Sequence, residues 1–119
     1  MSDIIEWVLE MDVQAGQGDA VEPLVSELSA ATKSDEPGAL TYEYYISDDK
    51  SRVTVIERYT NNAAAMVHLG NFGAKFADRF LATFAPTRLV VYGPAEADLR
   101  AAVEGFGAVH MDYLVGFHR

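Results

Sequence analysis

Three residues of the chain are candidates for the chemistry of a site, namely His68 and Glu57 for proton transfer and Arg88 for holding an anion. An unperturbed histidine titrates near pH ~6.5, so His68 is of a type that can accept a proton at neutral pH. Glu57 becomes a base at that pH if burial raises its pKa, and Arg88 could hold an anion. Each residue also has a structural interpretation. His68 can be a satisfied or surface histidine on a helix, and Arg88 a charge on an outer face. Glu57 can form an ordinary contact with Tyr42 or Arg88.

The chain lacks the familiar motifs of catalysis and of cofactor binding. It has no glycine-rich phosphate loop, no G-x-S-x-G nucleophile elbow and no dinucleotide-binding fingerprint. The absence of cysteine excludes disulfides and thiolate metal sites. The three histidines, His68, His110 and His118, are too scattered to indicate a metal cluster. The sequence therefore gives no specific support for a metal site.

Most of the side chains expected near Glu57 are aromatic. Residues 39–47 and 51–60 have the composition of two hairpin strands, and a tip at residues 49–50 places Tyr42 opposite Glu57. The inner face of this sheet then gathers the aromatic residues Trp7, Tyr42, Tyr44 and Tyr59. A cavity lined in this way would suit a flat, apolar molecule held by two or three hydrogen bonds.

Residues 61–84 follow the hairpin and are predicted to form a helix with an interruption. The glycines of the GNFG stretch, residues 70–73, predict a break. We expect the break to turn the helix so that His68 and Phe72 border the mouth of the pocket described above. Phenylalanine recurs at every fourth residue from there, which helical periodicity explains best as core packing, at Phe72, Phe76, Phe80 and Phe84.

The order of the predicted elements is that of a ferredoxin-like α+β fold. Strands are predicted at residues 4–13, 39–47, 51–60, 87–93 and 108–119, and helices at 19–31, 61–84 and 94–107. This order predicts an antiparallel sheet with helices on one face. We expect a single domain over residues 1–119, with a core at about 4–91 and a helix–strand extension at 94–119.

Such a sheet has one face that no helix covers. We expect that face to carry charged residues mixed with apolar ones, namely Ile4, Val8, Ile56, Leu89 and Val91 with Glu6, Glu10 and Arg58. A surface of this size and polarity predicts a homodimer contact. The apolar end of the last strand could pair with the edge of a partner's sheet.

Composition limits the classes of partner. The 119 residues include 18 acidic and 9 basic side chains, which gives a formal net charge of −9. This charge repels polyanions, so a nucleic-acid partner is not expected. No window approaches the ~18 apolar residues of a membrane helix, so no membrane partner is expected either. The N-terminal stretch MSDIIEWVLEMD lacks the basic region of a signal peptide, and a cytoplasmic location is expected.

Two stretches, EPGALTYEYYIS and VTVIERYTNNAAAMVHLGN, resemble the antibiotic biosynthesis monooxygenase domain family. In that family a Glu-Pro-Gly turn leads into a tyrosine-bearing strand. A second strand ends in Glu-Arg-aromatic, and a short helix then carries a His-Leu pair. The resemblance covers roughly residues 4–91, and its matching positions are Glu36, Pro37, Gly38, Tyr42, Glu57, Arg58, Tyr59, His68 and Leu69.

The resemblance implies a dimeric ferredoxin-like barrel with one pocket per subunit and an enzyme that uses neither a metal nor a flavin. The anion of a phenol or quinol would itself react with oxygen, so the protein would bind the aromatic molecule, remove a proton and favour the anion. His68 would be the base, Arg88 would hold the oxyanion and Asn62 would orient the ring oxygen. Glu57 would tune His68 or Arg88.

The first functional prediction is therefore a cofactor-independent monooxygenase that acts on a small hydroxylated aromatic or quinol. The main alternative is a non-catalytic dimeric barrel that binds a small apolar ligand in sensing or stress response. A haem-degrading monooxygenase is the third interpretation. The haem-degrading branch of the family carries a tryptophan after its asparagine, and this chain lacks that tryptophan, with Tyr59 or Met66 nearby.

Overall fold

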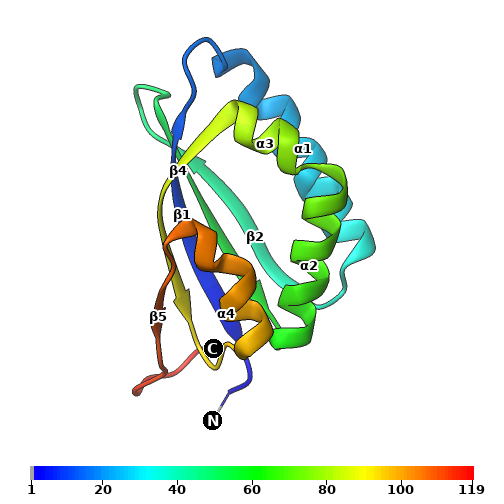
Figure 1. Ribbon diagram of the computed structural model, residues 1–119, viewed down its shortest axis with the longest axis vertical. Helices are drawn as coiled ribbons and strands as arrows, with labels where there is room; N and C mark the ends of the chain where they lie inside the picture. The colour runs from blue at the N-terminus through cyan, green and yellow to red at the C-terminus, as the bar shows by residue number, and fades with distance from the viewer. Residues whose placement is uncertain (1) are drawn as a thin grey trace.

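The computed structural model describes residues 2–119, which form one five-stranded sheet with the helices packed on one side (Figure 1). The strands are β1 (Ile5–Val13), β2 (Ala39–Ile46), β3 (Arg52–Tyr59), β4 (Phe84–Tyr92) and β5 (Val109–Met111). The helices are α1 (Gly18–Asp35), α2 (Asn62–Lys75), α3 (Ala77–Thr83), α4 (Ala97–Val103) and the 3-10 helix η1 (Glu104–Phe106). The strand order is β2-β3-β1-β4-β5, and only β4 and β5 run parallel. The predicted ferredoxin-like α+β class is confirmed.

Alternation of side chains along the central strands separates a core face from an outer face. In β1 the residues Ile5, Trp7, Leu9 and Met11 are buried, and the residues between them are partly exposed. This is the period of two that a strand imposes on side-chain direction. The core residues of β3 follow the same rule, and they are Val53, Val55, Glu57 and Tyr59. Glu57 thus carries a carboxyl group into an otherwise apolar core face.

The predicted hairpin and its register are confirmed. Tyr42 pairs with Glu57 across β2 and β3. At the tip, Lys50 adopts a left-handed conformation with φ of 64°, and its N–H donates to the Ser47 carbonyl at 2.9 Å. Asp49 accepts hydrogen bonds from the side chains on both sides of the tip. Because a hairpin turn fixes the pairing downstream, this tip determines which residues face Glu57.

The predicted helix break at residues 70–73 is wrong. α2 runs without interruption through Gly70 and Gly73, and neither glycine adopts a positive φ. A glycine in a helix costs only about 1 kcal/mol relative to alanine, a cost that packing of the apolar helix face can offset. The chain bends instead at Phe76, where φ is −127° and ψ is −16°. Phe84, predicted as the last of a helical series, begins β4.

The side-chain directions predicted for β4 are also wrong. The pairing of β4 with β1 places Leu89 beside Leu9 and Val91 beside Trp7, on the core face. Both β4 residues are buried there, with 4% and 0% of their surface exposed. A register shift between Glu10 and Met11 accompanies this pairing. The outer face therefore does not carry Leu89 and Val91.

The C-terminal segment is less regular than predicted. The predicted helix at 94–107 is the shorter α4 followed by η1, and the last strand is only β5. Beyond it, Leu114, Val115 and Phe117 are each more than 80% exposed. Among residues 2–119, none of the helices is long and apolar enough to cross a membrane.

Candidate active site

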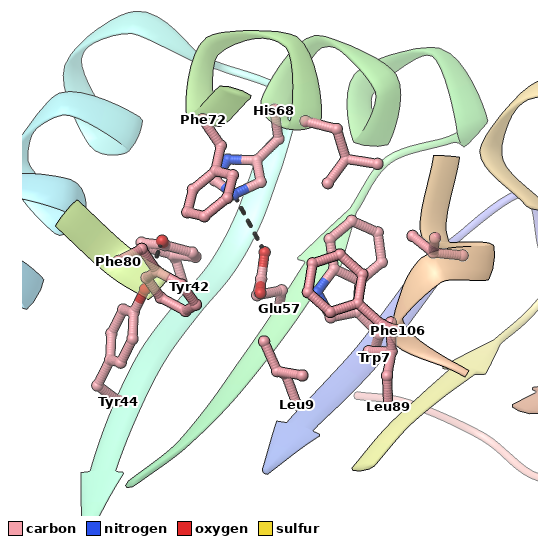
Figure 2. A pocket seen from close by; sticks show the side chains of 12 residues that line it. Trp7, Leu9, Tyr42, Tyr44, Glu57, His68, Phe72, Phe80, Leu89 and Phe106 are labelled. Atoms are coloured by element: carbon pink, nitrogen blue, oxygen red, sulfur yellow. Dashed lines mark hydrogen bonds and ion pairs between the residues drawn. The ribbon is translucent and has the colours of Figure 1, made fainter. Parts of the chain in front are cut away.

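A cavity of about 60 Å³ lies between the core face of the sheet and the helices (Figure 2). Its lining is apolar or aromatic except for one carboxyl, one imidazole and two phenols, and consists of Trp7, Leu9, Tyr42, Tyr44, Glu57, His68, Leu69, Phe72, Phe80, Leu89, Val103 and Phe106. Five of the six residues predicted to bind a ligand lie in this lining. The sixth, Tyr59, is buried and contacts Glu57.

His68 on α2 and Glu57 on β3 point toward each other at the cavity (Figure 2). His68 Nε2 lies 3.2 Å from Glu57 Oε1, and the two residues are only 4% and 5% exposed. The Tyr59 hydroxyl donates a hydrogen bond to the same carboxyl oxygen at 2.6 Å. A carboxyl and an imidazole that meet in a site shielded from water can exchange one proton with a ligand.

The other ring nitrogen of His68 meets a second buried carboxyl. His68 Nδ1 lies 2.9 Å from Glu36 Oε1, and Glu36 is only 6% exposed. The Asn71 side chain donates to the second oxygen of Glu36 at 3.3 Å. Sequence reasoning did not assign Glu36 to the site. Its position in the Glu-Pro-Gly turn was the one available signal, because nothing in the spacing of residues 36 and 68 brings them together.

The turn that follows α1 positions Glu36. Glu36 ends α1 with its N–H bonded to the Thr32 carbonyl, and its own carbonyl accepts from the Ala39 N–H, both at 3.0 Å. A Cβ atom at Gly38 would lie 2.6 Å from Ala64 Cβ on α2. The turn can therefore approach α2 this closely only with glycine at that position, and this approach brings Glu36 to His68.

Burial raises the pKa of the Glu57 carboxyl, because its charged form loses hydration in the apolar core. The nearby His68 and the hydrogen bonds from Tyr59 and Trp7 act in the opposite direction without cancelling the effect of burial. A carboxylate has about four acceptor positions, so Glu57 keeps capacity for a ligand hydroxyl. His68 has none left, since both of its ring nitrogens already face carboxyl groups.

Tyr42 and Tyr44 form the second polar group of the lining. Their hydroxyls lie 2.6 Å apart, and their rings meet edge to face with centroids 5.2 Å apart. Burial is the main cause that raises the pKa of both phenols. They therefore stay protonated at neutral pH and can donate a hydrogen bond to a ligand oxygen.

Aromatic rings hold the His68 imidazole in place. Its ring centroid lies 5.1 Å from that of Tyr42, 5.3 Å from that of Tyr59 and 6.4 Å from that of Phe72. As predicted, His68 and Phe72 both border the pocket, although α2 is continuous between them. The fixed ring gives the proton exchange with Glu57 a defined geometry.

The structure does not bring Asn62 or Arg88 to the cavity. The Asn62 side chain donates to Asp98 Oδ1 at 2.9 Å and accepts from the Glu96 N–H at 2.8 Å, which fastens the start of α4 to α2. Arg88 lies on the outer face, where it is 66% exposed and 3.5 Å from Glu10. Its outer-face interpretation therefore holds, and the predicted roles of both residues at the ligand lose their geometric basis.

The described residues offer a defined set of chemical functions. Their aromatic side chains can stack on a flat group, the tyrosine pair can donate hydrogen bonds, and Glu57 and His68 can exchange a proton. Within residues 2–119, no group of three or more histidine, aspartate or glutamate side chains is arranged to hold a metal ion.

Comparison with solved structures places this architecture among known folds. MupZ from Pseudomonas fluorescens superposes with a TM-score of 0.86 at 19% identity, covering 99% of this chain and 96% of the other. SnoaB from Streptomyces nogalater, described as a cofactor-independent oxygenase, gives a TM-score of 0.66 at 16% identity, with 81% and 97% covered. At these identities the likeness concerns the fold.

A third structure, a candidate antibiotic biosynthesis monooxygenase from Caulobacter crescentus CB15, is 26% identical, with a TM-score of 0.67 and 80% and 92% of the two chains covered. No curated protein sequence matches the chain significantly. The model of the antibiotic biosynthesis monooxygenase family matches residues 4–86, which is more than half of the chain. The chain therefore belongs to the antibiotic biosynthesis monooxygenase family.

Proposed function

We propose that the protein is a cofactor-independent monooxygenase that acts on a small hydroxylated aromatic molecule such as a phenol or quinol. The observation that carries this proposal is the buried Glu57–His68 pair in a cavity whose other lining is aromatic and aliphatic. Family membership supports a monooxygenase-type reaction. The cavity supports the substrate class, because aromatic walls favour a flat molecule and the carboxyl favours a hydroxyl group.

The reaction requires no reductant other than the substrate. One phenol with a free para position and one dioxygen give one quinone and one water, so the ring supplies all four electrons. The hydroxyl proton first passes to the protein, and the phenolate transfers an electron to dioxygen. The two radicals combine at the para carbon to give a peroxide anion, which takes the proton back. Loss of the ring C–H proton with cleavage of the O–O bond then releases water and leaves the quinone.

Glu57 is the residue that we assign to the ligand proton. It has acceptor capacity left, and burial raises its pKa above that of an exposed carboxyl, which makes it a stronger base. His68 holds Glu57 and shares its proton, and Glu36 fixes the imidazole from the other side. The tyrosine pair would hold the ligand oxygen in place of the predicted Arg88 and Asn62.

Oxygen uptake by the purified protein tests this function. A panel of small phenols and quinols is supplied under isotope-labelled dioxygen, and we expect at least one to give a quinone with one labelled oxygen atom. Glu57→Gln should abolish most of the uptake, while Arg88→Ala serves as the matched control with a charge removed from the opposite face. Saturable binding of the panel without any uptake would contradict the proposal and favour a ligand-binding protein.

We also propose that the protein is a homodimer that associates through the outer face of the sheet. Ile4, Val8 and Ile56 remain on that face without helices to cover them, and each is only partly buried. Sedimentation at micromolar concentration should give twice the mass of the chain. A monomer under those conditions would contradict this assembly.

A further inference from the structure

The cavity is too small for the ligand class proposed above. An engineered protein cavity of ~150 Å³ binds benzene, whereas this one measures about 60 Å³. A hydroxylated aromatic ring therefore enters only if part of the wall moves outward. This inference rests on the proposed function, since it takes the ligand to be aromatic.

Most of the wall is unsuited to such movement. Trp7, Glu57 and Leu89 lie on central strands of the sheet and are no more than 5% exposed. The hydroxyls of Tyr42 and Tyr44 are joined by a hydrogen bond. A displacement of any of these residues would break buried contacts or strand pairing, which makes them the fixed part of the cavity.

Phe106 differs from the rest of the lining. It lies on η1, and with 37% of its surface in solvent it is more exposed than any other side chain of the lining. Figure 2 shows its ring at the cavity, on the segment that follows α4 and not on a strand of the sheet. Part of its ring already faces solvent, so the ring has a direction in which it can turn without displacing the strands of the sheet.

Glycine residues flank Phe106 on both sides. A Cβ atom at Gly105 would meet no atom within 4 Å, and Gly107 adopts a left-handed φ of 67°. Two glycines around one bulky side chain give the backbone freedom to turn that side chain. The segment Gly105-Phe106-Gly107 therefore has the backbone freedom that a movable part of the cavity wall needs.

The helix before this segment is firmly attached. Leu99 and Val103 of α4 are buried, with 0% and 2% exposed. The side chain of Asn62 on α2 holds Asp98 and the Glu96 N–H at the start of α4. Movement can thus be confined to η1 while α4 remains in place.

We propose that Phe106 is the gate of the pocket and sets the size of aromatic ligand that the pocket accepts. The closed position is the one in the structure, with the ring completing the cavity wall. An aromatic ligand binds when the ring turns outward about its flanking glycines. Phe106 lies beyond residues 4–86, the part of the chain that the family model matches, so this gate belongs to the C-terminal segment.

Trp7 provides a direct test, because it is the single tryptophan of the chain and lines the cavity. Quenching of its fluorescence by 4-nitrophenol and by the two-ring 4-nitro-1-naphthol is followed after rapid mixing. Phe106→Ala should raise the association rate of the two-ring ligand by about 10-fold or more, since binding no longer waits for a conformational change. It should also remove most of the rate difference between the two ligands.

Phe117→Ala is the matched control, because it removes a phenylalanine of the same C-terminal segment that is 82% exposed and does not line the cavity. It should leave the association rates within about 2-fold of the wild type. Unchanged rates in Phe106→Ala, or equal acceleration in Phe117→Ala, would overturn the gate while leaving the aromatic ligand class intact. An absence of quenching in every variant would overturn both the gate and the proposed function. A Gly105→Ala variant, which should slow binding, keeps the test decisive if Phe106→Ala folds poorly.

Discussion

Glu57 and Glu10 lie on adjacent strands of the same sheet but face opposite sides. Glu10 points to the outer face, where it lies 3.4 Å from Arg52 and 3.5 Å from Arg88 with its side chain 29% exposed. Glu57 points to the core face, where it meets His68 and a tyrosine hydroxyl and is 5% exposed. Two glutamates of identical chemistry thus receive different roles from the direction of their side chains.

The two faces differ in how much an ion pair on each contributes to the stability of the fold. An exposed pair such as Glu10–Arg88 contributes only about 0–1 kcal/mol, because water solvates both charges. A buried pair has lost that solvation, so removal of one partner leaves a charge that costs about 3–5 kcal/mol. Functional charge chemistry is therefore expected on the core face, and each substitution below tests that contrast.

The largest effect is expected from Glu57→Gln. This change keeps the shape of the side chain and its contact with Tyr59 but removes the group that accepts the ligand proton. Turnover of any substrate found in the oxygen-uptake panel should fall by about 10²–10⁴-fold. Steady-state oxygen consumption measures it, and an unchanged rate would remove Glu57 from the mechanism.

His68→Ala should have the largest effect on stability. Its removal leaves Glu57 and Glu36 without their shared partner, and the free energy of unfolding should drop by about 3–5 kcal/mol at neutral pH. Urea denaturation of this variant is compared with Val67→Ala, an exposed position on the same helix. A loss no larger than that of the control would show that the buried carboxyls do not depend on His68.

The pH dependence of that loss follows from the raised pKa of Glu57. A carboxyl with a raised pKa in the folded state stabilises the fold below its ordinary value of 4.5, and this contribution is lost as the pH rises through the raised value. Without His68, which opposes the rise, the pKa should increase further. The destabilisation should therefore shrink in acid, and denaturation at acidic and neutral pH measures it. A constant loss would contradict this sign.

Asn62→Ala should have an intermediate effect. It removes two hydrogen bonds that fasten α4 to α2, each with a net value of about 0.5–1.5 kcal/mol, so unfolding should become easier by about 2 kcal/mol. Turnover should change less than 10-fold, because Asn62 does not reach the cavity. A collapse of turnover at unchanged stability would restore Asn62 to a role at the ligand.

The smallest effect is expected from Arg88→Ala on the outer face. Loss of an exposed ion pair with Glu10 should change the free energy of unfolding by about 0–1 kcal/mol and leave oxygen uptake unaltered. Thermal unfolding and oxygen uptake measure both quantities. A large loss of turnover would place the ligand, against the present assignment, near the outer face.

Sequence patterns predicted the strands around the site because period-two alternation is a local property. The alternation in β1 and the hairpin tip at residues 49–50 were enough to place Trp7, Tyr42 and Glu57 on one face. A single error of direction in β4 had two consequences. It placed Leu89 and Val91 on the outer face, and it left Arg88 open as a candidate for holding an anion, since neighbouring residues of a strand point to opposite sides.

Other parts of the site depend on long-range contacts that no local pattern contains. Glu36 and His68 meet through a turn packed against α2, and this contact becomes visible only once the fold brings the two segments together. The helix through Gly70 and Gly73 is a case in which packing overrides propensity. Phe106 was included in a predicted helix, where its position at the cavity could not be inferred.

The central claim is that Glu57 takes a proton from a hydroxylated aromatic ligand. The most direct measurement is the absorption spectrum of bound 4-nitrophenol, whose anion absorbs at longer wavelength than its neutral form. At a pH below the ligand's own pKa, the wild type should show the anion band on binding, and Glu57→Gln should bind the ligand in its neutral form. A neutral spectrum in both proteins, or an equal anion band in both, would contradict the account.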